Sequence, residues 1–197
     1  MRGVFPVRVG KAEMRQGTRR ETLREATRDI HARLDDTVGE LDDLSAYGAY
    51  LESTIRFRSE VETVLEEAAW PRDWTWRPVA SRPHLLADAA DLGIEPPAGR
   101  AFMARPTNVS ALFGILYVVE GSSLGAKILR RRAARLGLGD AFGARHLAAI
   151  AEGGGWRSFV TLLEESAEFE PAHAIASASA TFATALDCYE GGTRAAA

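Results

Sequence analysis

Three glycines, Gly114, Gly121 and Gly125, fall on one face of a long helix that the sequence predicts from Asn108 to Leu136. At about 100° per residue they lie within about 40° of one another. Each interior glycine costs a helix roughly 0.8–1 kcal/mol relative to alanine, so this stripe sacrifices local stability. Something must approach the backbone closely there, either a tightly packed neighbouring helix or a flat ligand.

His31 is the second residue whose type and place could support chemistry. It lies at the margin of an apolar helical stripe, whose members are Leu23, Thr27, Ile30 and Leu34. A neutral imidazole at such a margin can face a cavity and is a good iron ligand, but a histidine there is more often a structural or half-exposed residue. Glu25 and Asp35 are both near enough to hydrogen-bond its ring, and the sequence does not choose between them.

Two segments carry a family resemblance. One is Tyr-Val-Val-Glu-Gly-Ser-Ser-Leu-Gly, from Tyr117 to Gly125, and the other runs from Leu23 to Asp35 around the histidine. They resemble the distal and proximal helices of the heme oxygenases, in the form of the bacterial branch associated with bacteriophytochromes. Segments 82–93, 156–159 and 180–182 are similar to the middle and C-terminal helices of that family, so the resemblance covers residues 20–190.

The resemblance implies a porphyrin held between His31, as the axial iron ligand, and the bare main chain at Gly121 and Gly125. It also implies that Arg24 and Arg157 pair with the heme propionates. The further pocket residues that it implies are Thr27, Val118 and Phe182.

The chain departs from the family pattern at three positions. Many animal members have an aspartate where this chain has Ser122, whose hydroxyl can hold water but supplies no carboxylate. Many have a further glycine in place of Ala126, and some have a basic residue in place of Thr161. Together with Gly121 and Gly125, Ser122 is expected to steer oxygen toward one meso carbon, through ordered water and steric contact. Glu120 points away from the stripe and is expected to be an internal ion-pair partner.

The implied function is a heme oxygenase, which converts heme, O2 and electrons to biliverdin, ferrous iron and carbon monoxide. Heme is then both cofactor and substrate. The electrons are expected from an external ferredoxin or reductase, since the sequence has no glycine-rich dinucleotide motif between a strand and a helix. A bacteriophytochrome is a candidate acceptor for the biliverdin.

The main alternative is a non-catalytic tetrapyrrole carrier or interaction protein with the same fold. A di-iron oxidase would need two Glu-x-x-His pairs on inward-facing helices, but the sequence has one such spacing, Glu170 to His173, interrupted by Pro171. The lone cysteine, Cys188, excludes an internal disulfide framework and is expected to be a small apolar residue of the last helix.

Composition is consistent with one globular domain. The 197 residues are 46% hydrophobic, enough for one sizeable core, and the formal net charge of −3 gives no basic field for nucleic acid. The sequence has no apolar run of about 18 residues and no signal-peptide segment, so we expect a cytoplasmic protein without a membrane partner.

The positions of glycine and proline, which end helices, predict an all-α, single-domain helical bundle at residues 18–192, and the family resemblance implies the heme oxygenase fold for it. A mobile arm is predicted at residues 1–17 and a tail at 193–197. Thr18 to Glu21 has capping-box spacing. Besides the glycine-striped helix, the predicted helices are 19–38, 45–70, 83–93, 140–150, 156–168 and 172–190, with Ser45 and Asp140 as caps and Gly191-Gly192 closing the last.

Overall fold

The computed structural model describes residues 17–98, 103–153 and 155–195, with side chains to 191; the predicted arm, apart from residue 17, lies outside them. These residues form α-helices and no strand, apart from isolated bridges at Gly139. The helices are α1 (Arg19–Ala26), α2 (Arg28–Val38), α3 (Leu44–Glu66), α4 (Arg82–Asp91), α5 (Val109–Arg135), α6 (Arg145–Glu152), α7 (Gly155–Glu165) and α8 (Pro171–Ala195). The all-α prediction is confirmed.

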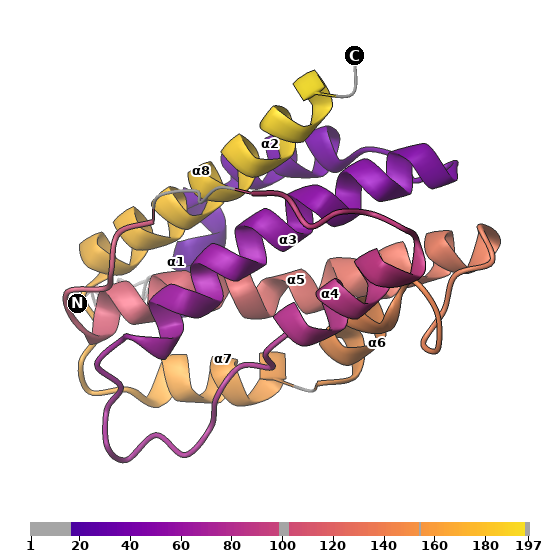
Figure 1. Ribbon diagram of the computed structural model, residues 1–197. Coiled ribbons are helices and arrows are strands. Elements are labelled where there is room, and N and C mark those ends of the chain that lie inside the picture. The colour runs from indigo at the N-terminus through magenta and orange to yellow at the C-terminus, as the bar shows by residue number, and fades with distance from the viewer. Residues whose placement is uncertain (1–16, 99–102, 154, 196–197) are drawn as a thin grey trace, which may run out of the picture.

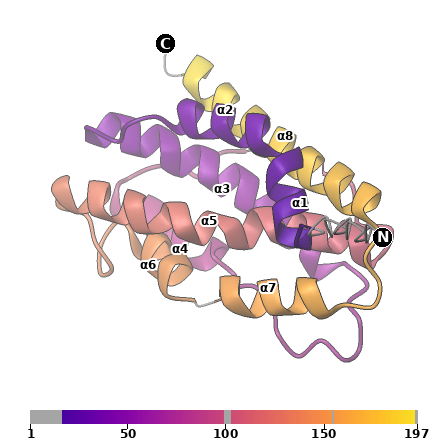
Figure 2. The same ribbon diagram turned by 180° about the vertical axis from the view of Figure 1, so that it is seen from behind.

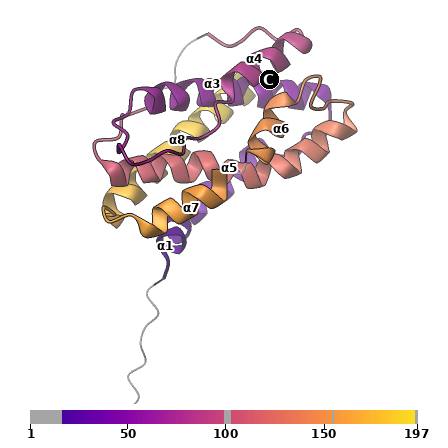
Figure 3. The same cartoon turned by 90° about the horizontal axis from the view of Figure 1, so that it is seen from below.

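The helices form one bundle around α5. The most extensive helix contact joins α5 to α8, and α2 lies beside α8 along one edge of the molecule (Figure 1). Seen from behind, α1 crosses α8 toward α7, which lies along the first half of α5 (Figure 2). The view from below shows α4 and α6 together at the opposite end from the start of α8 (Figure 3).

The predicted first helix, residues 19–38, is divided at Thr27. Thr18 and Glu21 make the predicted capping box at its start. Thr27 has φ −108° and ψ 7°, and its hydroxyl donates to the Leu23 carbonyl at 2.8 Å. A threonine that bonds back to the preceding turn bends a helix, and this bend turns α2 away from the line of α1.

Two predicted helix starts are wrong, one because a neighbouring residue is the cap and the other because the predicted cap pairs with another helix. Asp43 caps α3 instead of Ser45, accepting from Ala46 N at 2.8 Å. Asp140 does not cap α6, because its carboxylate pairs with Arg130. The chain turns through Gly143, at φ 72°, before α6 begins at Arg145.

Two predicted helix ends also move. Helix α3, the second predicted helix, ends at Glu66, before the predicted Trp70–Pro71 step. Trp70 folds back there, and its indole donates to the Leu65 carbonyl at 2.8 Å. Gly191-Gly192 does not close α8, which continues to Ala195. Glycine weakens a helix by roughly 1 kcal/mol, which an established long helix can absorb.

The central helix α5 passes between two hydrophobic cores. Its first half packs with residues such as Phe159, Leu163 and Phe182, and its second half with Tyr47, Leu51, Leu85 and Leu147. The change occurs between Val119 and Ala126, the stretch that holds two glycines of the stripe. Although the sequence excluded a spanning run, α5 is long and apolar enough for one by length and composition. Its most apolar window is 61% buried in the bundle, as expected for a core helix.

Candidate functional site

A large cavity opens between α2 and α5, with α3 and α8 behind it. Its volume is about 1010 Å³. This is at the upper limit of the 300–1,000 Å³ that is typical of small-molecule sites. The predicted site residues that line it are Arg24, Thr27, His31, Val118, Gly121, Ser122, Gly125 and Phe182. Segments more than a hundred residues apart in sequence therefore meet at one site.

His31 lies on the α2 wall of this cavity. Its Nδ1 is 3.1 Å from Asp35 Oδ2, and its ring meets Phe182 edge-on at a centroid distance of 5.3 Å. Asp35 is thus the acidic neighbour that orients the ring, while Glu25 pairs with Arg28. A ring with Nδ1 held by a carboxylate offers Nε2 to a metal, which is the usual arrangement of a ligating histidine.

The glycines of α5 have two different roles. A Cβ added to Gly114 would lie 2.7 Å from Ala178 N and 2.9 Å from Ser177 Cβ, so this glycine serves the crossing of α5 and α8. A Cβ on Gly125 would meet nothing within 4 Å, and one on Gly121 would meet only Trp156, at 3.7 Å. These two glycines leave bare main chain facing the cavity, while helix packing accounts for Gly114.

Ser122 lines the cavity with its hydroxyl proton already engaged. Its Oγ donates to the Val119 carbonyl at 2.6 Å and accepts from Arg58 Nη2 at 2.6 Å. A hydroxyl has one proton and two lone pairs, so one lone pair remains for a molecule in the cavity. Ser122 can therefore hold a water as an acceptor, which is also what a carboxylate would do at this position.

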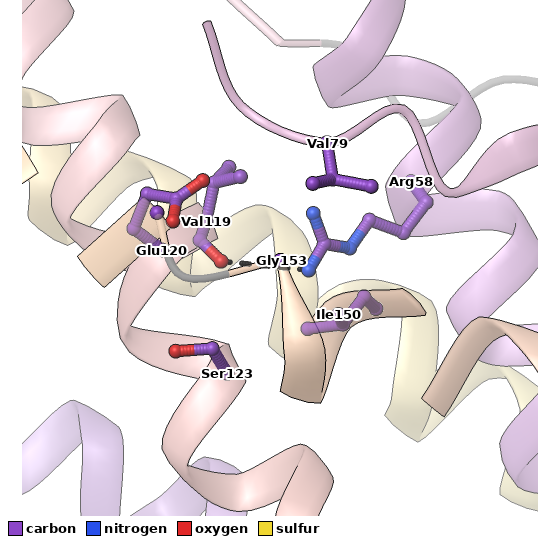
Figure 4. Close-up of a pocket in the computed structure, with 8 residues that line it drawn as sticks. Arg58, Val79, Val119, Glu120, Ser123, Ile150 and Gly153 are labelled. Carbon is purple, nitrogen blue, oxygen red and sulfur yellow. Dashed lines mark hydrogen bonds between the residues drawn. The ribbon is translucent and has the colours of Figure 1, made fainter. Parts of the chain in front are cut away.

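Arg58 joins this wall to a second, much smaller cavity on the other side of α5. The side chain comes from α3, is 3% exposed, and reaches the Val119 carbonyl at 3.4 Å (Figure 4). The small cavity, about 10 Å³, has room for one water beside Arg58, Glu120 and Ser123.

Burial raises the pKa of Glu120, and the charge of Arg58 lowers it. The predicted ion pair is wrong: Glu120 forms no salt bridge among the described residues, and Arg58 affects it only as a nearby charge.

The rim of the large cavity carries four arginines, and the acidic side chains of Asp35, Asp36 and Glu40 also line the cavity. Arg20, Arg24 and Arg28 line it from the first two helices, and Arg132 lines it from the end of α5. Arg157, predicted to contact the same ligand, is exposed on α7 and is not among the lining residues, although its neighbour Trp156 is. The guanidinium groups of the rim can bind carboxylates bidentately.

Several cavity residues were not identified from the sequence. Tyr50, Thr54 and Arg58 line the cavity from α3, and Tyr189 lines it from α8. The three α3 residues are spaced four apart, so polar side chains fall along one stripe of a helix that is otherwise mostly buried. This spacing was the available signal. Of the positions that depart from the family, Ala126 lines the cavity and Thr161 does not.

The site therefore combines an imidazole on one wall, bare main chain on the other and cations at the rim. The arrangement suits a flat, largely apolar molecule with a metal at its centre and acidic groups at one edge. The polar wall at Ser122 and Arg58 would contact the face opposite the imidazole, where a small reactant such as O2 could approach.

Comparisons with known proteins identify similar sequences and a similar structure. The chain is 34% identical over 160 residues to heme oxygenase PigA of Pseudomonas aeruginosa, covering 76% of this chain and 79% of that protein. It is 34% identical over 108 residues to a heme oxygenase of Xanthomonas campestris pv. campestris, covering 53% and 60%. The NO- and CO-bound heme oxygenase from Neisseria meningitidis has a similar fold, with TM-score 0.69, 26% identity, and 90% and 92% of the two chains covered. No family model matches the sequence.

Proposed function

This chain belongs to the heme oxygenase family, and on that premise we propose that it binds heme between α2 and α5 and degrades it. The reaction consumes O2 and electrons and yields biliverdin, ferrous iron and carbon monoxide. Bound heme supplies both the iron that activates O2 and the ring carbon that is oxidised. The protein contributes binding, orientation and control of water.

One observation carries the proposal: the His31 imidazole and the glycine main chain of α5 line the same cavity. The residues fit heme. The Nδ1 atom of His31 is held by Asp35, which leaves Nε2 for iron. The space over Gly125 is open, where any side chain would narrow it.

The rim and walls would fix how the ring sits. Arg24, with Arg20 and Arg28, would pair with the propionates at the cavity mouth. The apolar contacts would come from Val118 and Phe182, both nearly buried. Thr27 would contribute its methyl group, because its hydroxyl is bonded back to Leu23. The propionate role predicted for Arg157 would pass to these rim arginines.

Gly121, Gly125 and Ser122 would control the chemistry on the α5 side. The two glycines allow the main chain to approach the ring and restrict the direction in which O2 can lie. Ser122 would accept a hydrogen bond from a cavity water, turning the other hydrogen of that water toward the reacting centre. Arg58 keeps the serine oxygen in that orientation and adds a positive charge beside it.

The proposed partners follow from what the reaction needs. Electrons would come from an external ferredoxin or reductase. Biliverdin could pass to a bacteriophytochrome. A cytoplasmic location, as predicted from the sequence, is part of this proposal, and the apolar helix α5 is used as the core of the bundle.

A carrier that binds heme without degrading it is the alternative, and one experiment separates the two functions. Hemin is titrated into purified wild-type protein, His31→Ala and the control His173→Ala, whose histidine is exposed on α8 away from the cavity. We expect a histidine-ligated absorption spectrum in the wild type and the control, and its loss in His31→Ala. Reductant and O2 should then produce bile pigment.

A histidine-ligated spectrum without pigment would favour the carrier. If the wild type took up no heme specifically, both heme functions would be refuted. If His31→Ala kept the wild-type spectrum, another residue would be the ligand.

A further inference from the structure

A buried chain of polar side chains leads from the surface to the cavity and is not used in the function described above. Asp88, on α4, accepts from His146 Nδ1 at 2.8 Å, and His146 Nε2 is 3.1 Å from the Tyr50 hydroxyl. Asp88 and His146 are fully buried, and Tyr50 lines the large cavity. At the outer end, Arg145 bonds to both Asp88 and Asp91.

The direction of each hydrogen bond in this chain can be assigned. Asp88 also accepts the backbone N–H groups of Arg145 and His146, at 2.9 and 3.0 Å. These bonds and that from the His146 ring lower the pKa of Asp88 despite burial, so it is a carboxylate and can only accept. His146 Nδ1 must therefore carry a proton.

Burial lowers the pKa of His146, so its ring is neutral at pH 7. A neutral imidazole with its proton on Nδ1 has a lone pair on Nε2. The Tyr50 hydroxyl therefore donates its one proton to His146, away from the cavity.

Other hydroxyls of the cavity wall are oriented in the same way. Thr54 donates to the Tyr50 carbonyl at 2.7 Å, and Ser122 donates to the Val119 carbonyl at 2.6 Å. Thr27 donates to the Leu23 carbonyl. Each of these groups has spent its proton on the protein, so it can act only as an acceptor toward any other group. At Thr54 that second partner is the Tyr189 hydroxyl, at 2.8 Å.

We propose that Tyr50 is a further cavity residue of the reaction, a hydrogen-bond acceptor whose direction is fixed by the positioning residues His146 and Asp88. Together with Ser122 it forms a wall of acceptors, which binds water by one hydrogen and turns the second hydrogen toward the reacting centre. The inference rests on the proposed function, because the cavity must hold heme for this orientation to matter.

The charges around Tyr50 are distributed over several helices. Arg58 and Tyr47, on the same helix, and Tyr189, on α8, are its electrostatic neighbours. Asp88 and Arg145 lie beyond His146, and His84 acts on the ring of His146 from α4. A single-atom change at Tyr50 is therefore the cleanest perturbation, since it leaves every one of these charges in place.

The matched variants are Tyr50→Phe and Tyr47→Phe. Tyr47 lies one turn away on α3, is fully buried, and donates to the Gly143 carbonyl at 2.7 Å without lining the cavity. Each ferric, heme-loaded protein is titrated with base, and the midpoint between the acid and alkaline absorption spectra is measured. A hydrogen-bond acceptor near the heme stabilises the acid form, which has one more proton to donate than the alkaline form. Removing the acceptor should therefore lower the midpoint pH.

For Tyr50→Phe we expect a downward shift of about 0.4–1 pH unit, equivalent to one hydrogen bond of about 0.5–1.5 kcal/mol. Tyr47→Phe should leave the midpoint unchanged. An upward shift in Tyr50→Phe would mean that the hydroxyl donates into the cavity, and would overturn the proposal. No shift, or equal shifts in both variants, would overturn it too.

A second measurement needs neither heme nor a variant. Nitrogen NMR of the heme-free wild type should show the His146 proton on Nδ1 at pH 7. A proton on Nε2 would reverse the Tyr50 hydrogen bond and refute the assigned direction. Failure of the proposed function would be recognised separately, as absence of heme uptake by the wild type.

Discussion

Alanine at Gly114 and alanine at Gly125 should change the stability of the heme-free protein in opposite directions. Both residues are interior positions of α5, so both variants gain the same helix propensity, roughly 0.8–1 kcal/mol. They differ in what surrounds the new methyl group. At Gly125 it has no neighbour within 4 Å, whereas at Gly114 it meets the backbone of α8.

The magnitudes follow from this difference. Gly125→Ala should be more stable than wild type by roughly 1 kcal/mol, which for a chain of this size raises Tm by about 2–4 °C. In Gly114→Ala the methyl group would lie 2.7 Å from Ala178 N, and a helix backbone cannot move aside as a side chain can. Overpacking of this kind costs about 1–3 kcal/mol. A contact this close belongs at the upper end of that range, and the gain in helix propensity offsets roughly 1 kcal/mol of the cost. The net loss of stability is therefore about 2 kcal/mol, or about 4–8 °C in Tm.

The assay is thermal and urea unfolding of both variants without heme, followed by hemin titration. Gly121→Leu is added to fill the space over the main chain, and it should weaken heme binding while leaving the fold intact. If Gly114→Ala were as stable as wild type, α5 and α8 would not be in the contact described. If Gly125→Ala were destabilised without heme, or if Gly121→Leu bound heme normally, the space over α5 would not be the ligand site.

Two further predictions concern buried groups outside the heme contacts. The pKa of His146 is lowered by burial and that of Asp88 by its hydrogen bonds, so both disfavour folding in acid. Stability should fall as pH drops below about 6.5, where His146 is protonated only in the unfolded chain, and again below about 4 as Asp88 is protonated. Urea unfolding at a series of pH values tests this, and His146→Asn should abolish the first fall. Burial raises the pKa of Cys188 to about 11, so its thiol should react with a thiol reagent only after denaturation, and rapid native labelling would contradict the described packing.

The sequence predicted most helices because their signals are local. Asn108 caps α5 and Thr18 with Glu21 caps α1, each through side chains within three residues of the bond they make. Helix starts that depend on distant residues were missed. The N-terminus of α6 is held by Asp88 of α4, so its own cap position, Ala144, has no side-chain bond to reveal it.

The glycine stripe illustrates the limit of periodicity. Spacing put Gly114, Gly121 and Gly125 on one face, which tertiary structure divides between a helix crossing and an open cavity. Periodicity determines which residues share a face but not what covers each part of it. The neighbour at Gly114 is a helix that starts more than fifty residues later.

By itself, the sequence determined the all-α class, the family motifs and the candidate residues on α2 and α5, because helix periodicity and short motifs depend on neighbours along the chain. Only the tertiary structure decided that His31 meets Phe182 at the cavity wall, that Arg157 lies away from the cavity, and that Arg58 and Tyr50 join it. These outcomes depend on how helices cross. A crossing is set by the packing of whole faces, and no single segment of the sequence contains that information.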